Sequence, residues 1–219
     1  MVKNYWRKKL LELVREKVKK DRTGHDYFHL LRTEKYALWI AKHENNVDKE
    51  VLSAAALIHD VGRVDELNGK EHISVGVELA EKWLQKINFP NKKIPKVIEA
   101  IKLHEQRIWQ NNKEKVKYKE TLVIQDADRL DIIGALGIAR AFQFAGAHNI
   151  KLYEPKYKIK SRYIYRGLKH DPSELHHIMN KYLNEKFNTK TAKKLSKKRI
   201  KFIKEFVKRF VDEWEVDLK

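Results

Sequence analysis

The sequence contains no cysteine, and only 8 glycines and 4 prolines among its 219 residues. The absence of cysteine excludes disulfides, thiolate metal ligands and cysteine nucleophiles, so any metal ion must be held by histidine, carboxylate or water. A sheet protein needs frequent turns and alternating apolar and polar residues, and this sequence has few turn formers and no alternating stretch of useful length. We therefore expect an all-α protein.

Long apolar runs are also missing. No stretch approaches the roughly 20 apolar residues that cross a bilayer, and Lys3, Arg7, Lys8 and Glu12 interrupt what would be the apolar part of a signal peptide. We expect a cytoplasmic protein with no membrane partner. Lys and Arg number 48 against 30 Asp and Glu, a net charge of +18, which favours anionic partners such as phosphorylated metabolites or nucleic acid.

The sequence does contain a series of segments with helical periodicity. With 42% hydrophobic residues and no break that resembles a linker, we expect one domain over residues 1–219, with its core at about 20–145. The segment at about 48–59 is apolar almost all round, which predicts a central, buried helix. The spacing predicts further helices at about 5–19, 26–43, 73–87, 94–104, 117–126 and 132–144.

The C-terminal part is the more basic one. Residues 150–219 carry 20 Lys or Arg against 9 Asp or Glu. Tyrosines interleave with Lys and Arg at about 149–171 without helical periodicity, which predicts a long basic loop. Helices within about 173–216 are expected to pack on the core, with their lysines on the solvated face. One apolar helical face is predicted from Ile203, Phe206, Val207, Phe210, Val211 and Trp214.

Histidines and aspartates stand at the ends or on single faces of these predicted helices. His59-Asp60 ends the central buried helix. His25, His29 and Arg32 are spaced i, i+4, i+7, which places them on one stripe of the preceding helix. Imidazole and carboxylate groups at rigid helix ends are suitable ligands for a divalent metal ion.

More such residues follow downstream. His72 precedes one predicted helix and His104 ends another, and an acidic cluster with Asp126, Asp128 and Asp131 begins after an apolar stretch. On a helix Asp128 and Asp131 share a face, whereas Asp126 points elsewhere. If Asp128 binds a metal ion, Asp131 is expected to support a nearby arginine or histidine.

The order His29, then His59-Asp60, then Asp128 resembles the HD-domain superfamily of metal-dependent phosphohydrolases. The resemblance is closer to a branch of predicted HD-domain hydrolases in bacteria and archaea, and it spans most of the chain through residues 25–32, 57–63, 126–140, 188–193 and 213–215. It implies an HD-domain helical bundle with a C-terminal helical extension. It also implies an enzyme that cleaves a phosphate ester or anhydride of a small molecule by metal-activated water, with nucleotides as the expected class.

The resemblance further implies a first metal site formed by His29, His59, Asp60 and Asp128. The ion is Mn, Fe, Co, Ni, Mg or Zn, because ligand type alone does not select among them. A second ion is the further expectation, with His72 and His104 available to it. The alternative for these two histidines is a hydrogen bond to the substrate phosphate or to the backbone.

Roles in catalysis and substrate binding follow from the same positions. We expect Asp60 to bridge two ions or to orient the attacking water, and His25 to donate a proton to the leaving oxygen or to act as a helix cap. His104 is a further catalytic candidate. The candidates for binding the substrate phosphate are Arg32, Arg63, Arg129 and His72, and a structural ion pair is the alternative for each arginine.

Two other hypotheses compete with the enzyme. One is a basic nucleic-acid-binding protein, which predicts salt-sensitive binding that survives chelation of metal ions. The other is a non-catalytic HD-fold regulator, against which the presence of all four metal-ligand types argues. The basic loop at about 149–171 either closes over a substrate or is a solvated surface loop.

Overall fold

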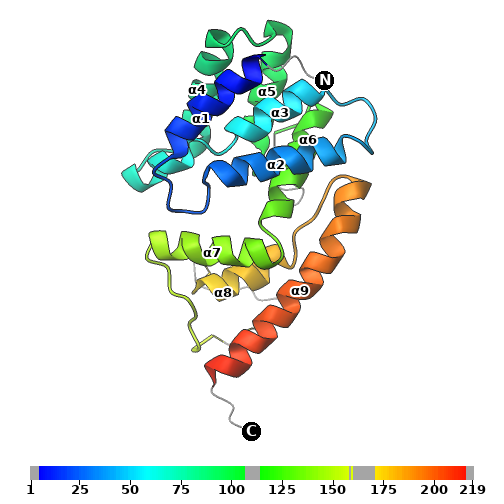
Figure 1. The fold of residues 1–219 in the computed structure, drawn as a ribbon. Coiled ribbons are helices and arrows are strands. Elements are labelled where there is room, and N and C mark those ends of the chain that lie inside the picture. The colour runs from blue at the N-terminus through cyan, green and yellow to red at the C-terminus, as the bar shows by residue number, and fades with distance from the viewer. Residues whose placement is uncertain (1–4, 107–113, 158, 160–170, 216–219) are drawn as a thin grey trace.

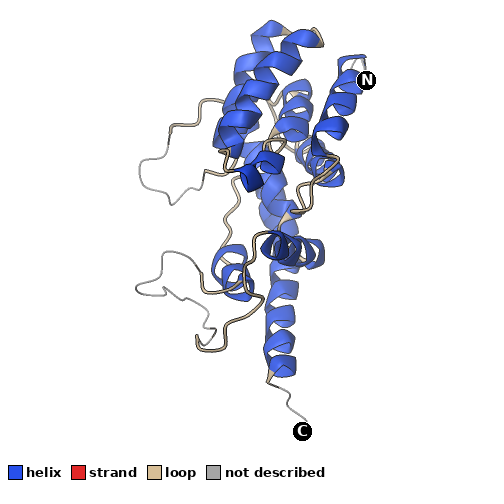
Figure 2. Ribbon diagram, turned by 90° about the vertical axis from the view of Figure 1, so that its left-hand side faces the viewer, coloured by secondary structure: helices blue, strands red, loops and turns tan. Residues whose placement is uncertain are grey.

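The computed structural model describes residues 5–106, 114–157, 159 and 171–215. The regular elements in this part of the chain are helices, and it contains no strand, which confirms the all-α prediction (Figure 2). The α-helices are α1 (Tyr5–Val18), α2 (Tyr27–Ile40), α3 (Lys49–Ile58), α4 (His72–Lys86), α5 (Ile94–Leu103), α6 (Lys119–Asp131), α7 (Ala135–Ala147), α8 (Glu174–His177) and α9 (Lys190–Trp214). Short 3-10 turns lie at Arg63–Asn68 and Asn91–Lys93, and a π turn lies at Ile178–Tyr182.

Helix α3 lies at the centre of a bundle formed with α1, α2, α4, α5 and α6 (Figure 1). Every residue from Val51 to Ile58 is buried, which confirms the prediction of a central helix. The helix begins at Asp48, whose carboxylate accepts hydrogen bonds from the backbone amides of Glu50 and Val51. Its small alanines let neighbouring helices approach closely, so the helix end that carries His59 is held by packing on all sides.

Helix α6 continues to Asp131, five residues beyond its predicted end at Asp126. The two aspartates at the predicted end and at the observed end have partners from distant parts of the chain. Asp126 accepts hydrogen bonds from the backbone amides of Asn188 and Thr189, and Asp131 lies in buried ion pairs. Helix α7 begins only at Ala135, after Gly134 takes a positive φ of 87° that allows the chain to turn sharply.

Helices α7, α8 and α9 form a second layer below the bundle (Figure 1). Thr189 caps α9, and Ile203 and Val207 on its inner face are buried. Phe142 of α7 stacks on Phe210 of α9 with ring centroids 6.0 Å apart. The predicted apolar face therefore does pack on the rest of the protein, although Trp214 at its end is 43% exposed.

The predicted basic loop lies partly outside the described residues, which omit 158 and 160–170. Its described beginning is not simply solvated, because Tyr153 is buried and meets the Trp214 ring edge to face. Among the described helices, no single one is long and apolar enough to cross a membrane. Only α6 and α7 taken together have the length and composition for it, and an angle of 83° separates them.

Candidate metal centre

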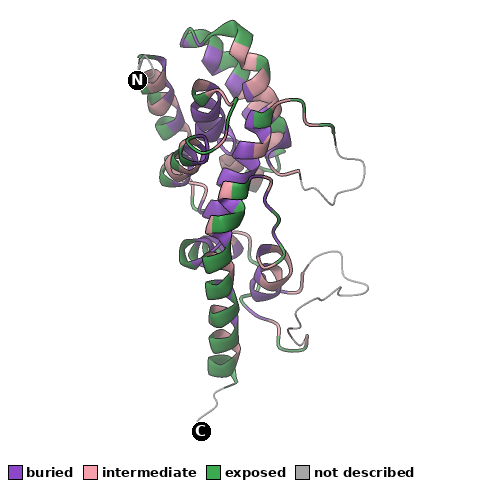
Figure 3. Cartoon of the chain, turned by 90° about the vertical axis from the view of Figure 1, so that its right-hand side faces the viewer, coloured by how far each residue is buried: buried purple, intermediate pink, exposed green. Residues whose placement is uncertain are grey.

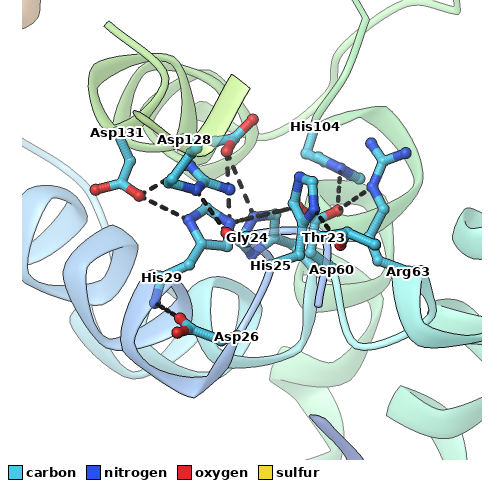
Figure 4. Close-up of polar contacts among 12 residues, drawn as sticks. Thr23, Gly24, His25, Asp26, His29, Asp60, Arg63, His104, Asp128 and Asp131 are labelled. Carbon is cyan, nitrogen blue, oxygen red and sulfur yellow. Dashed lines mark hydrogen bonds and ion pairs between the residues drawn. The ribbon is translucent and has the colours of Figure 1, made fainter. Parts of the chain in front are cut away.

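The four residues predicted as the first metal site lie together in the structure, and Figure 4 shows three of them, His29, Asp60 and Asp128. His29 Nε2 is 3.3 Å from both His59 Nε2 and Asp60 Oδ2, and Asp128 Oδ1 is 3.8 Å and 3.6 Å from the two imidazole nitrogens. All four ligand atoms lie within 4.8 Å of one another. Ligands that share one ion at about 2.0–2.2 Å are themselves separated by roughly 3.0–3.6 Å, so this set fits a divalent cation.

Three helices deliver these side chains. His29 stands in the first turn of α2, where its backbone amide donates to the N-cap carboxylate of Asp26. His59 is the C-cap of α3 with Asp60 directly after it, and Asp128 lies in the last turn of α6. His29 and His59 are fully buried and Asp60 is nearly so, which keeps the ligand set rigid and largely shielded from water.

Hydrogen bonds determine which ring nitrogen faces the cluster. His29 Nδ1 donates to Asp131 Oδ2 at 2.8 Å, and His59 Nδ1 donates to the carbonyl of Ala56 at 2.9 Å. Because carbonyl and carboxylate oxygens only accept, each Nδ1 carries a proton and each Nε2 points to the centre, where it can bind a cation once it has no proton of its own. This is the orientation that metal-ligating histidines need.

The electrostatics of the cluster also favour a cation. Burial lowers the pKa of His59, but the carboxylates of Asp60 and Asp128 outweigh it and raise that pKa to about 10. Burial likewise raises the pKa of the Asp60 carboxyl, yet His59 and Arg63 hold it well below its usual range. The two carboxylates are thus ionised at neutral pH and hold a proton on His59, the place that a bound divalent cation would take.

A second group of ligand atoms adjoins the first and comprises Asp60, His72 and His104. His104 Nδ1 donates to the carbonyl of Ile101 at 2.7 Å, and His72 Nδ1 lies 2.7 Å from Glu66 Oε1. The Nε2 atoms of both rings are buried and make no hydrogen bond in the described part of the chain, although carboxylates lie 3.2 Å from that of His104 and 3.8 Å from that of His72. Such orphaned buried nitrogens fit a ligand that the structure does not contain.

Asp60 faces both groups. Its Oδ2 atom points to His29 and His59, whereas its Oδ1 atom lies 3.2 Å from His104 Nε2. Arg63 also reaches the Oδ1 atom at 3.2 Å, while its other donors pair with Glu66 and Glu105. The arrangement is that of a carboxylate able to bind two ions at once.

His25 borders the same cluster, with its Nε2 atom 3.9 Å from Asp60 Oδ2. The Thr23 hydroxyl donates to Asp21 at 2.7 Å, and it can therefore accept a hydrogen bond from His25 Nδ1, 2.8 Å away. Burial lowers the pKa of His25 well below its ordinary value. The Nε2 atom thus presents a lone pair to the cluster, and His25 must gain a proton before it can act as the predicted donor.

The three predicted phosphate-binding arginines have different positions. Arg63 lies at the cluster, and Arg32 is part-exposed beside it, held by Asp131 at 2.8 Å. Arg129 does not lie there: it is 1% exposed, pairs with Glu185, and donates to the carbonyls of Gln106 and Lys186. These contacts agree with the structural ion pair that is the alternative for Arg129, because successive residues of a helix point about 100° apart and Asp128 already faces the centre.

Several residues of the site were not predicted. Arg140 of α7 donates to Asp131 at 2.9 Å and to the carbonyl of Gly24 at 2.6 Å, which links the second layer to the loop before α2. Thr23 and Asp21 position the His25 ring. Their separation along the sequence gives no indication that they meet, although Arg140 is the last residue of the segment 126–140 that carries the family resemblance. Asp131 does have the supporting role that was expected of it.

The HD domain profile matches residues 26–133, the part of the chain that carries all four ligands of the first group. The chain belongs to the HD-domain superfamily of phosphohydrolases. A relative in Bacillus subtilis, the uncharacterized protein YpgQ, is 32% identical over 149 residues, which cover 67% of this chain and 70% of YpgQ.

Solved structures share the fold over nearly the whole chain. A protein from Lactobacillus plantarum superposes with a TM-score of 0.79 and 28% identity, covering 99% of this chain and 100% of its own. An HD-superfamily hydrolase from Bacillus thuringiensis has a TM-score of 0.67 and 28% identity, with 95% and 96% covered. YpgQ in complex with ADP has a TM-score of 0.67 and 30% identity, with 93% and 96% covered.

Proposed function

We propose that this protein is a metal-dependent phosphohydrolase that cleaves a phosphate ester or anhydride of a nucleotide. The observation that carries the proposal is the convergence of His29, His59, Asp60 and Asp128, whose ligand atoms lie within 4.8 Å of one another. The hydrogen bonds that orient both imidazoles support it, because they turn both Nε2 atoms toward the carboxylates, as metal-ligating histidines require.

The donor set suits Mn, Fe, Co, Ni, Mg or Zn. A divalent ion held there supplies Lewis-acid chemistry: it lowers the pKa of bound water to about 7 and neutralises charge on a phosphoryl oxygen. No protein nucleophile is then required. His25 Nε2, 3.9 Å from Asp60, is placed to take up and return a proton at the reacting centre, and Arg63 is placed to contact a phosphate oxygen.

We propose a second ion bound by Asp60, His72 and His104. Its support is that the two buried Nε2 atoms make no hydrogen bond of good geometry within the described residues, and that Asp60 lies between the two ligand groups. A second ion held by these residues would add Lewis-acid charge stabilisation to that of the first. Asp60 is then the residue on which both ions depend.

A nucleotide is the substrate class that the comparisons favour. YpgQ, which shares the fold at 30% identity, has been crystallised with ADP. The net charge of +18 also favours a polyphosphate over a neutral substrate. A hydrolysable nucleoside di- or triphosphate satisfies both observations.

The test is a hydrolysis screen of the purified protein loaded with Mn²⁺, Co²⁺ or Ni²⁺. Nucleoside mono-, di- and triphosphates and sugar phosphates are offered, and released phosphate, pyrophosphate and nucleoside are measured. Asp60→Asn is expected to lose at least 100-fold in activity and to retain less metal by elemental analysis. Asp212→Asn, an exposed carboxylate on α9, is the matched control and is expected to match the parent. Equal turnover in the Asp60 variant and the parent would reject the site.

A further inference from the structure

Helix α9 has a strongly charged outer face that the proposed function does not use. Seven lysines form it, all of them exposed. At 100° per residue they fall within an arc of about 100°, and over their 19 positions they extend for about 27 Å. We call this surface the lysine stripe; it consists of Lys190, Lys193, Lys194, Lys197, Lys201, Lys204 and Lys208.

No neighbouring carboxylate neutralises the stripe. Residues 190–204 contain no Asp or Glu, and no ion pair joins a stripe lysine to an acidic residue within the described ranges. Elsewhere the protein does pair its lysines: Lys93, for example, bridges Asp48 and Glu50 at 2.7 Å. The stripe therefore presents an uncompensated positive field to solvent.

The opposite face of α9 is already occupied. Ala192, Ile203 and Val207 are buried against the protein, and Arg199 donates to the carbonyl of Leu130 and to the Tyr36 hydroxyl. The outer face along the free length of the helix is exposed (Figure 3). A membrane-surface helix needs a free apolar face beside its charges, and the two exposed large apolar residues of α9, Phe202 and Trp214, lie outside the arc of the stripe. A partner can therefore interact with the stripe only through its positive charge.

We propose that the lysine stripe binds the phosphate backbone of double-stranded nucleic acid without reading its sequence. Lysine is a mobile point charge that suits phosphates, whereas base edges are read mainly by forked or amide side chains, and the stripe has none. Single strands are bound on aromatic stacking platforms, which the stripe also lacks. A duplex carries one charge per about 1.7 Å of its axis, so its charge density can engage every stripe lysine.

The test measures binding of labelled 24-base-pair duplexes of two unrelated sequences by fluorescence anisotropy. EDTA is present throughout, so that the metal centre takes no part. Between 50 and 200 mM NaCl the logarithm of the association constant is expected to fall with a slope of about −4 or steeper, equally for both sequences. The Asp60→Asn variant is expected to bind as the parent does, which separates this proposal from the catalytic one.

Two variants of equal charge change decide whether the stripe is responsible. The first variant carries Lys193→Gln, Lys194→Gln, Lys197→Gln and Lys201→Gln. It is expected to bind the duplex at least tenfold more weakly at 100 mM NaCl, and the slope of its association constant against salt should be shallower by about 3. The control places Gln at four exposed lysines outside α9 and is expected to change binding less than threefold. These lysines are Lys70, Lys82, Lys86 and Lys92.

Several results would overturn the proposal. They are the absence of duplex binding at 50 mM NaCl, equal weakening in the two four-lysine variants, and tighter binding of single strands than of duplexes. Stripe-dependent binding of anionic lipid vesicles without duplex binding would assign the surface to a membrane instead. Circular dichroism of both variants checks that they fold as the parent does.

Discussion

The residue that connects most of the site is Asp131, although it is not itself placed as a ligand. It accepts hydrogen bonds from His29 Nδ1, from Arg32 and from Arg140, and it is almost completely buried. Burial raises the pKa of this carboxyl, but His29 and Arg32 together hold it far below its usual range. Asp131 therefore stays ionised, fixes the His29 ring and neutralises two guanidinium groups.

Asp131→Asn should weaken metal binding by 10- to 100-fold, because a neutral amide fixes the tautomer of His29 less strongly than a carboxylate does. The buried Arg140 also loses its counter-ion, so the free energy of unfolding should fall by about 3 kcal/mol. Calorimetric metal titration and urea unfolding measure the two effects. Asp65→Asn, which removes a part-exposed pair with Lys17, should cost less than about 1 kcal/mol. Unaltered metal affinity in the Asp131 variant would contradict this role.

Glu174 gives a pH dependence at a site remote from the metal centre. Burial raises its pKa to about 7, while Lys181 lowers it only in part. The folded state then holds a proton that the unfolded state releases above its ordinary pKa of 4.5. The contribution of Glu174 to stability is therefore present below about pH 4.5 and is lost as the pH rises through 7.

Glu174→Gln should remove this dependence. Between pH 5 and pH 8 the variant should gain up to about 3 kcal/mol relative to the parent, because its neutral side chain never ionises. Urea unfolding of both proteins at a series of pH values measures the difference. If the difference in unfolding free energy between variant and parent stayed constant from pH 5 to pH 8, Glu174 would have the same pKa in the folded and unfolded states.

At the scale of elements, the junction between α3 and α4 controls the second ligand group. The chain turns at Gly62 directly under the start of α4, where a Cβ atom would come within 2.1 Å of the His72 carbonyl oxygen. That carbonyl belongs to the first residue of α4, so a side chain at position 62 must displace the helix that carries His72. The close approach is therefore what brings His72 toward His104 and Asp60.

Gly62→Ala should consequently disturb the second group more than the first. We expect a loss of stability of about 1–3 kcal/mol from the forced displacement, together with fewer bound metal ions per chain. Metal analysis and urea unfolding check both points. Gly146→Ala is the matched control, since nothing lies within 4 Å of its added Cβ, and it should be neutral or slightly stabilising. If the Gly62 variant binds as many metal ions per chain as the parent, the turn at Gly62 does not position the second ligand group.

At the scale of the whole molecule, the metal centre joins helices that are distant in sequence. The first ligand group ties α2 and the end of α3 to α6, and Arg140 adds α7 from the lower layer. Without a cation the ionised carboxylates of Asp60 and Asp128 repel each other inside the bundle. A bound ion is therefore expected to stabilise the fold as well as to support catalysis.

Removal of metal by EDTA should lower the melting temperature, and addition of Mn²⁺ should restore it. A free ion at 100 times its dissociation constant stabilises the native state by about 2.7 kcal/mol. Differential scanning fluorimetry measures the shift. The Asp60→Asn variant should respond to neither reagent, and an equal response in that variant would place the stabilising ion elsewhere.

Much of this protein follows from the sequence, since helical periodicity is a local property carried by residues three and four apart. The helices and the buried helix at the centre could be predicted on that basis, whereas the set of His and Asp ligands was implied by the resemblance to the HD-domain superfamily. The true end of α6, the position of Arg140 at the site and the buried position of Arg129 away from it could not. Each depends on a partner far along the chain, and only the packed structure decides which partners meet.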